Sequence, residues 1–166
     1  SIDSGTTWIE VQPAGNMDRS WRTTNISADG TKLLAGVSGS GRLYRSLDGG
    51  VTWTELKPAG DVNKNWRTTS MSIDGTKILA GDYYRLYRTV DSGATWKEVQ
   101  PAVNVDKEWN TISMGADGIK RLAGNSSRLY RSLDSGVTWM EVQPAGNVER
   151  SWSITSMSID GIKILA

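Results

Sequence analysis

The sequence predicts an all-β fold built from repeated four-stranded antiparallel units, and three observations support this prediction. Tryptophan recurs at intervals of 45, 43 and 43 residues, at Trp8, Trp53, Trp96 and Trp139. Residues 46–80 and 132–166 are identical at 24 of 35 aligned positions, which indicates internal duplication. Short β-rich segments alternate with Gly, Asp and Asn, and no apolar period of 3.6 residues is sustained. A repeat near 43 residues is typical of propeller blades or paired-helix solenoids, and this local pattern favours blades.

The second repeat illustrates the expected order within a blade. Its four strands are predicted at residues 65–72, 77–81, 85–89 and 94–99. Asp74 and Gly75 are expected to supply the two positive-φ residues of a tight hairpin turn between the first two strands. Pro101 lacks an amide hydrogen, so it should end the last strand and begin a loop over residues 100–107 that leads to the next blade.

The repeats divide the whole chain. We expect a single repeat domain over residues 1–166, with repeats at 1–45, 46–88, 89–131 and 132–166. This gives a β-propeller with three complete blades and an incomplete fourth, or a part of a larger ring. Residues 6–11 are expected to form a last strand without its own first three. An unpaired strand edge is a template for association, so a homo-oligomer formed through the incomplete blade is a further expectation.

Composition excludes several classes of function. The 166 residues contain 19 Lys and Arg against 18 Asp and Glu, a net charge of +1 that indicates neither a nucleic-acid nor a membrane partner. Cysteine and histidine are both absent, which removes thiolate nucleophiles, imidazole bases, disulfides and zinc sites that use these ligands. We therefore expect no catalytic residues, no metal site and no cofactor.

A motif of the form Ser/Thr-x-Asp-x-Gly-x-Thr-Trp occurs four times at the repeat period. Its aspartates are Asp3, Asp48, Asp91 and Asp134, and its tryptophans are Trp8, Trp53, Trp96 and Trp139. The motif resembles the Asp-box of sialidase-type (BNR) repeats. The resemblance covers the whole chain and implies a β-propeller in which the Asp-box is structural and lies on the face away from the ligand. The resemblance alone also favours an extracellular or periplasmic protein.

The repeated aspartates admit two interpretations. Carboxylates can bind calcium or act in acid–base catalysis, but none of these lies in a calcium-loop pattern, and identical copies would be spread around a ring. The structural interpretation is favoured, because a short carboxylate can accept amide hydrogen bonds within a turn and a tryptophan can fill the gap between blades. The arginines are also repeat positions, and we expect them to pair with the glutamates of the last strands, Glu55, Glu98 and Glu141.

A candidate ligand site combines a second set of tryptophans with a variable loop. The residues are Trp21, Arg22, Trp66, Arg67, Trp109, Asn110 and, in the loop after the second strand, Tyr83 and Tyr84. Aromatic faces beside a guanidinium suit a sugar or a peptide. The tryptophans could instead be wedges between blades. If the ligand interpretation holds, Trp66, Arg67, Tyr83 and Tyr84 should cluster on one face.

Three hypotheses for the function follow. The first is a non-catalytic propeller that binds a glycan, as a multivalent lectin would, or a protein. The second is an engineered, reconstructed or purely structural repeat protein without a ligand. The third is a fragment of a sialidase-like glycoside hydrolase, which needs an asymmetric acid pair and an arginine cluster that the sequence does not show.

Overall fold

The computed structural model describes residues 1–102 and 106–166, and within these ranges it contains only strands, turns and loops. The first antiparallel sheet consists of β1 (Trp21–Ile26), β2 (Leu33–Val37), β3 (Leu43–Ser46) and β4 (Thr54–Leu56). The second consists of β5 (Thr68–Met71), β6 (Ile78–Gly81), β7 (Leu86–Thr89) and β8 (Lys97–Val99). The third consists of β9 (Trp109–Met114), β10 (Arg121–Asn125), β11 (Leu129–Ser132) and β12 (Met140–Val142).

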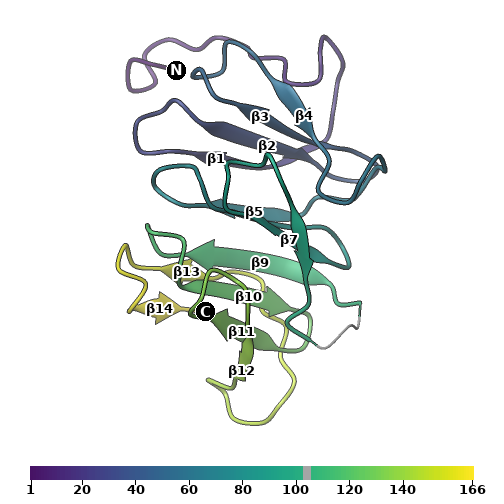
Figure 1. The fold of residues 1–166 in the computed structure, drawn as a ribbon, viewed down its shortest axis with the longest axis vertical. Coiled ribbons are helices and arrows are strands. Elements are labelled where there is room, and N and C mark those ends of the chain that lie inside the picture. The colour runs from purple at the N-terminus through teal and green to yellow at the C-terminus, as the bar shows by residue number, and fades with distance from the viewer. Residues whose placement is uncertain (103–105) are drawn as a thin grey trace.

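These sheets are the predicted blades. In each one the strands pair with their sequence neighbours, and the last described sheet is the two-stranded pair β13 (Ser156–Met157) and β14 (Ile164–Leu165). Figure 1 shows the sheets following one another along the long axis of the molecule. The all-β fold, with three four-stranded blades and the beginning of a fourth, is therefore as predicted.

Three local expectations need correction or fall partly outside the structure. Residues 6–11 form no strand, because no strand lies beside them to accept their backbone hydrogen bonds. The hairpin turn at Asp74 and Gly75 has only one positive φ, at Gly75 (68°). The chain there makes a longer turn, closed by the hydrogen bond from Ser72 N to Lys77 O (2.9 Å), so Asp74 keeps an ordinary φ. The expected loop 100–107 includes residues 103–105, which lie outside the described residues.

The hydrophobic core lies between the blades. One cluster joins β2, β3 and β4 of the first blade to the second, and it contains Leu34, Leu43, Leu56, Trp66, Ile78, Ala80 and Tyr87. A second cluster joins the second blade to the third, with Leu79, Leu86, Trp109, Ile112, Met114, Ala123 and Tyr130. The second blade thus buries apolar surface on both faces, which explains the continuous apolar run of its second strand.

Backbone hydrogen bonds connect the blades at the turns between their first two strands. Ala28 N donates to Ile73 O, Ile73 N to Ala116 O, and Ala116 N to Ile159 O, each at 2.8 Å. Lysine side chains join the same turns a second time. Lys77 Nζ donates to Asp117 O (2.7 Å), and Lys120 Nζ donates to Asp160 O (2.7 Å). These equivalent bonds hold successive blades at the same relative position.

A glycine in the second strand of each blade lets the next blade approach. A Cβ on Gly81 would lie 2.9 Å from Thr68 Cγ2, 3.0 Å from Leu86 Cδ2 and 3.5 Å from the Cβ of Trp109. Gly36 and Gly124 have the same surroundings. The glycine is therefore required by close packing, and it places the following tryptophan directly against the sheet.

Candidate functional site

The connections between strands lie at two opposite ends of the blades, because neighbouring strands are antiparallel. We call one end the turn face, formed by residues 27–32, 46–53, 72–77, 89–96, 115–120 and 132–139. We call the other end the loop face, formed by residues 37–42, 61–66, 82–85, 106–109 and 125–128. Side chains on the turn face bond mainly within their own turns, whereas side chains on the loop face contact residues of other segments.

On the turn face, each aspartate of the recurring motif closes its own turn. Asp48 Oδ1 accepts a hydrogen bond from Thr52 N (2.9 Å), and Asp48 Oδ2 accepts one from Thr52 Oγ1 (2.5 Å). Ser46 Oγ donates to the same carboxylate at 2.7 Å. The copies at Asp3, Asp91 and Asp134 make the same bonds. The Thr52 hydroxyl and amide, followed by Ser46, lower the pKa of Asp48 to about 2.

The tryptophans of the same motif are also held by their own turns. The indole nitrogens of Trp53 and Trp96 donate to the carbonyl oxygens of Gly50 and Gly93, both at 3.1 Å. Trp8 and Trp139 make the equivalent bond within their turns. Trp96 is half-buried against the cluster between the first two blades, and Trp139 is half-buried against the next cluster, whereas the Trp8 side chain is 79% exposed.

The second set of tryptophans has a different environment from the one a stacking platform needs. Trp66 is 1% exposed and Trp109 is 2% exposed. Each packs edge-to-face on a tyrosine of its own blade, Trp66 on Tyr87 at 5.7 Å between ring centroids and Trp109 on Tyr130 at 5.8 Å. Trp21 packs in the same way on Tyr44 but is 40% exposed. In this arrangement the two buried indoles offer no free face, because the preceding blade covers them.

The expected cluster on the loop face forms without Trp66. The Arg67 guanidinium carbon lies 4.9 Å from the centroid of the Tyr83 ring, a cation–π arrangement. Tyr83 and Tyr84 pack edge-to-face with centroids 4.7 Å apart, and Tyr84 is 51% exposed. The Tyr83 hydroxyl donates to Glu108 Oε1. The structure therefore brings Arg67, Tyr83 and Tyr84 together and adds Glu108, which the sequence did not point to.

An ion pair between the buried Asp82 and the half-buried Lys64 supports this cluster. Asp82 is 1% exposed, and its Oδ1 accepts hydrogen bonds from the backbone nitrogens of Tyr84 and Arg85, both at 2.6 Å. Its Oδ2 lies 3.0 Å from Lys64 Nζ. Burial opposes the charge on Lys64, but the hydrogen bond and charge of Asp82 outweigh it and raise the pKa of Lys64. Asp82 thus fixes the backbone that carries the tyrosine pair.

Asp82, Lys64 and Glu108 were missed because sequence reasoning treated the loop as a set of exposed contacts. One signal for Asp82 existed. The position holds Val37 in the first repeat and Asn125 in the third, and Asn125 Oδ1 makes the same backbone bonds, to Ser127 N (2.8 Å) and Arg128 N (2.7 Å). A side-chain acceptor four residues before the third strand therefore indicates a residue that caps the loop by accepting backbone hydrogen bonds.

The remaining predicted site residues do not join this cluster. Arg22 is exposed and Asn110 is half-buried, each on the first strand of its own blade. The first blade carries a hollow of about 250 Å³ on its loop face, lined by Arg19, Val37, Arg42 and Tyr44 among others. There Arg19 stands where Lys64 stands in the second repeat, and Val37 stands in place of Asp82. The loop faces of the blades are therefore chemically different.

The predicted arginine–glutamate pairs are confirmed for the arginines that open the third strands, Arg42, Arg85 and Arg128. Among the described residues, the arginines that close these strands, Arg45, Arg88 and Arg131, form no such pair. The N···O distances are 3.7 Å for Arg42–Glu55, 3.3 Å for Arg85–Glu98 and 3.5 Å for Arg128–Glu141. Arg85 Nη2 also lies 2.6 Å from Asp106 Oδ1, so the segment that enters the third blade is fastened to the second. The arginines that open the third strands therefore form ion pairs that stabilise the blades.

A tyrosine beside a glutamate also raises the question of nucleophilic chemistry. A phenol acts as a nucleophile when its pKa is lowered. Here the hydrogen bond to Glu108, burial and the glutamate charge raise the pKa of Tyr83, so the phenol stays protonated at neutral pH.

Among the described residues, no helix is long and apolar enough to cross a membrane.

The antiparallel four-stranded blades and the repeated Asp and Trp turns define the chain as a BNR-type β-propeller fold. The family described as photosynthesis system II assembly factor YCF48 has a model that matches residues 34–152, which is more than half of the chain. The chain therefore belongs to this family. No curated protein matches the sequence.

Solved structures share the fold at low sequence identity. YCF48 bound to a D1 peptide is 18% identical with a TM-score of 0.61, over 86% of this chain and 49% of that one. YCF48 from Cyanidioschyzon merolae is 16% identical with a TM-score of 0.62, over 78% and 39%. The GH74 xyloglucanase from Xanthomonas campestris is 16% identical with a TM-score of 0.65, over 92% and 30%. The chain thus spans half or less of the length of these proteins.

Proposed function

We propose that the chain is a non-catalytic protein-binding propeller segment and that it binds an extended segment of a partner protein on the loop face of the second blade. The observation that carries the proposal is the cluster of Arg67, Tyr83 and Tyr84 on a loop fixed by the buried carboxylate of Asp82 and its ion pair with Lys64. Tyrosine and arginine are the residues in which binding energy concentrates at protein interfaces. Rigid loops lose little conformational entropy on binding.

Family membership supports a protein as the partner. One YCF48 structure contains a D1 peptide, and we extend this kind of ligand to the present chain. We also propose that the Asp-containing turns are Asp-boxes and that the repeats at 1–45, 46–88, 89–131 and 132–166 form one domain. Association of copies through β13 and β14 stays a prediction, which light scattering can test.

The glycan and enzyme alternatives have less support. The likeness to GH74 enzymes lies far below 25% identity and indicates the fold alone. The raised pKa of Tyr83 does not suit a nucleophile. A hydrolase assay on fluorogenic glycosides and a glycan array should therefore both be negative.

The test is a binding titration with a D1 peptide by isothermal calorimetry. Tyr84→Ala and Arg67→Ala should each weaken binding at least tenfold, because they remove the exposed ring and the adjacent cation. Arg22→Ala is the matched control, since Arg22 occupies the position of Arg67 in the first repeat and lies beside no tyrosine pair. Equal losses in all three variants, or glycan binding without peptide binding, would refute the proposal.

A further inference from the structure

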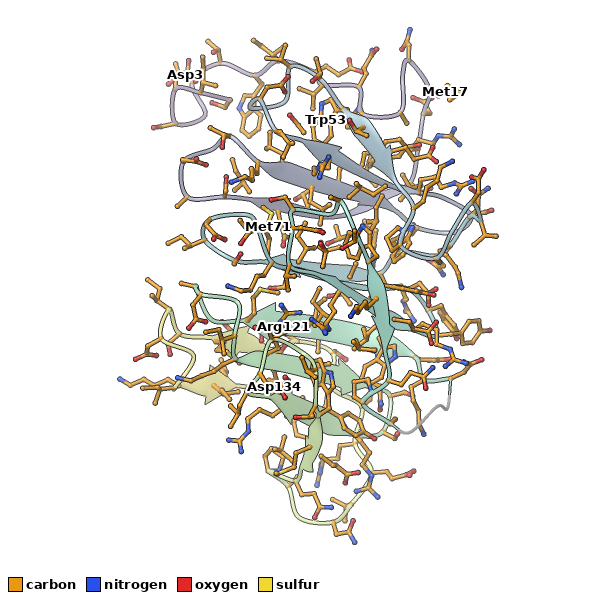
Figure 2. All side chains as sticks on the ribbon, viewed as in Figure 1. Asp3, Met17, Trp53, Met71, Arg121 and Asp134 are labelled. Carbon is orange, nitrogen blue, oxygen red and sulfur yellow. The ribbon has the colours of Figure 1, made fainter. Side chains whose placement is uncertain are left out.

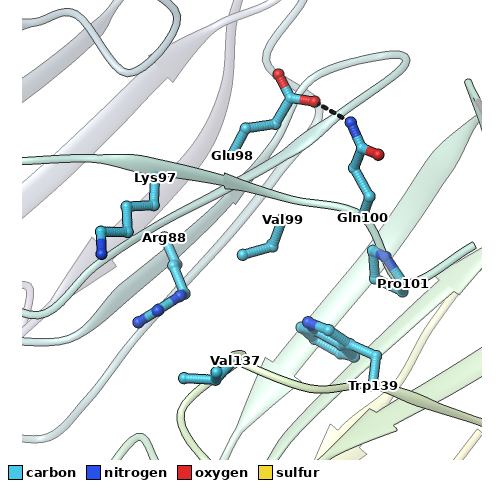
Figure 3. A pocket seen from close by; sticks show the side chains of 8 residues that line it. All are labelled: Arg88, Lys97, Glu98, Val99, Gln100, Pro101, Val137 and Trp139. Carbon is cyan, nitrogen blue, oxygen red and sulfur yellow. Dashed lines mark hydrogen bonds between the residues drawn. The ribbon is translucent and has the colours of Figure 1, made fainter. Parts of the chain in front are cut away.

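A groove between the second and third blades lies near the turn face, away from the tyrosine cluster. It has a volume of about 450 Å³. Figure 3 shows Arg88 and Lys97 side by side at one end, and Val99, Pro101, Val137 and Trp139 along the rest. The groove therefore has a cationic end and an apolar body.

The acid that lines this groove does not neutralise the cationic end. Glu98 Oε1 accepts a hydrogen bond from Gln100 Nε2 (2.5 Å) and lies 3.3 Å from Arg85 Nη1. Figure 3 shows that Glu98 and Gln100 are on the other side of Val99 from Arg88. No ion pair of Arg88 or Lys97 is found within residues 1–102 and 106–166.

A second arginine lies directly behind Arg88. Arg121 is completely buried, and its Nε donates to Gly118 O at 2.9 Å. Its Nη1 lies 3.2 Å, and Arg88 Cδ lies 3.3 Å, from the point that a Cβ on Gly136 would occupy, so the two side chains are neighbours. Arg121 Nη1 and Nη2 and Arg88 Nε are buried without a hydrogen-bond partner in the described part of the chain.

The carboxylate of Asp134 acts electrostatically on Arg121 but makes its hydrogen bonds within its own turn. Figure 2 labels Arg121 and Asp134, which lie in the same blade. Asp134 accepts hydrogen bonds from Ser132 Oγ (2.8 Å) and Thr138 Oγ1 (2.5 Å) instead of from Arg121. Burial and the charge of Arg88 lower the pKa of Arg121 to about 10, so the Arg121 guanidinium is charged at neutral pH. Among residues 1–102 and 106–166, neither of these two adjacent arginines forms an ion pair, although the charge of Asp134 acts on Arg121.

At the preceding junction the same repeat positions hold a single arginine, Arg45, whose Nε is also buried without a hydrogen-bond partner in the described part of the chain. Arg45 corresponds to Arg88, and its Nη1 donates to Ser92 O in the next blade. The position of Arg121 is occupied there by Ile78, an apolar residue. Arg88 makes no corresponding bond to Ser135 O among the described residues. Where the isoleucine is replaced by arginine, Arg88 lines the groove beside Lys97 (Figure 3).

We propose that this groove binds a carboxylate side chain of an extended acidic protein segment, with an adjacent apolar side chain on Val99 and Trp139. Arg88 and Lys97 contact the carboxylate directly, since guanidinium–carboxylate bonds are among the stronger hydrogen bonds. Arg121 is a positioning residue that acts through Arg88. The proposal rests on the protein-binding function above but concerns a different end of the blades.

The test follows the indole N–H signal of Trp139 by NMR in the whole 15N-labelled chain. The indole of Trp139 has a fixed position, because its nitrogen donates a hydrogen bond to Gly136 O (3.2 Å). The indole signal of Trp96 is the control, because Trp96 lies at the junction that lacks the arginine pair. The probes are the blocked peptides acetyl-Leu-Glu-Leu-amide and acetyl-Leu-Gln-Leu-amide. We expect the glutamate peptide to shift Trp139 saturably, the glutamine peptide to bind at least tenfold more weakly, and Trp96 to be unaffected.

Variants separate a binding role from a structural one. Arg88→Gln and Arg121→Ile should each weaken the glutamate peptide at least tenfold, whereas Arg45→Gln, the matched control, should change it less than twofold. Arg121→Ile restores the residue of the second blade and removes a buried unpaired charge, so its melting temperature should not fall. Tyr84→Ala should leave this titration unchanged, which distinguishes failure here from failure of the loop-face proposal.

Three results would overturn the inference. The first is an equal affinity for the glutamate and glutamine peptides, and the second is unchanged binding in a folded Arg121→Ile. The third is an affinity for acetate equal to that for the glutamate peptide, because the apolar part of the groove would then contribute nothing to recognition.

Discussion

The turn face and the loop face of the same blades differ in how far the repeats agree. On the turn face, each aspartate of the recurring motif accepts the same hydrogen bonds from a hydroxyl and from the threonine four residues later. On the loop face, the equivalent position at the end of the second strand holds Val37, Asp82 or Asn125. Asp82 and Asn125 accept equivalent backbone hydrogen bonds, but only Asp82 also pairs with a lysine among the described residues. The turn face therefore fixes the scaffold, and the loop face is where the repeats are free to acquire a binding surface.

The two faces also differ in the range of their contacts along the chain. The turn-face bonds of Asp48 join residues two and four positions apart. The loop-face cluster joins Arg67, Tyr83 and Glu108, which come from two different blades. A motif can encode the first kind of contact, but the second appears only once the blades are packed.

The largest expected effect is on stability, and it separates the tryptophans that are buried between blades from the one that is partly exposed. Trp109→Ala should lower the free energy of unfolding by about 3–5 kcal/mol, because it empties a fully buried site between blades. Denaturant titration measures this loss. Trp21→Ala is the control, and it should cost less because 40% of that side chain is exposed. Equal costs would mean that burial between blades does not decide the role of these tryptophans.

A turn-face aspartate should matter more for stability than a loop-face tyrosine. Asp91→Ala leaves the amide and hydroxyl of Thr95 without their acceptor, and we expect a loss of about 1–3 kcal/mol. Tyr84→Ala removes a half-exposed side chain and should stay within about 0.5 kcal/mol of the parent. Thermal melts of the two variants compare the faces directly, and the reverse order of stability would contradict the division proposed here.

Acid should unfold the protein through the turn face. Hydrogen bonds from Thr52, from Thr89 and from Ser72 are the largest causes that lower the pKa values of Asp48, Asp91 and Asp74 to about 2. A lowered folded-state pKa stabilises the fold above the ordinary value near 3.8, and this stability is lost as the pH falls toward 2. Circular dichroism should show a loss of structure between about pH 4 and pH 2. In Asp91→Ala this acid-dependent loss should be smaller.

The smallest expected effect concerns backbone strain in the turns. Ser135 adopts a φ of 61°, at the position where the second repeat has Gly49 at 71°. Glycine tolerates this region, so Ser135→Gly should relieve strain, offset by the greater freedom of glycine in the unfolded chain. We expect a stabilisation below about 1 kcal/mol, measured by melting temperature. A clear destabilisation would show that the serine side chain contributes in the folded state.

The fold was predictable from the sequence because its determinants are local and repeated. The Trp spacing and the turn motif indicated blades and their order, and the Arg–Glu pairs followed from cross-strand positions. The Asp74–Gly75 turn was predicted wrongly, because the same dipeptide can also lie in a longer turn whose aspartate caps the backbone.

The candidate site was predictable only in part. Tyr83 and Tyr84 were found because they break the repeat pattern, and Arg67 because it follows a tryptophan. The burial of Trp66 depends on how closely the first blade packs, and the partners of Asp82 and Tyr83 come from residues 18 and 25 positions away. Arg121 also breaks the pattern, and a comparison with Leu33 and Ile78 would have revealed it.

The most direct test of the central claim is to map D1-peptide binding onto the whole chain by amide chemical-shift perturbation. The account predicts that the largest shifts occur at Arg67, Tyr83, Tyr84 and Glu108, with the repeated turns at 46–53 and 89–96 unaffected. Shifts concentrated in those turns, with none at the tyrosine pair, would contradict the assignment of binding to the loop face and of stability to the turn face.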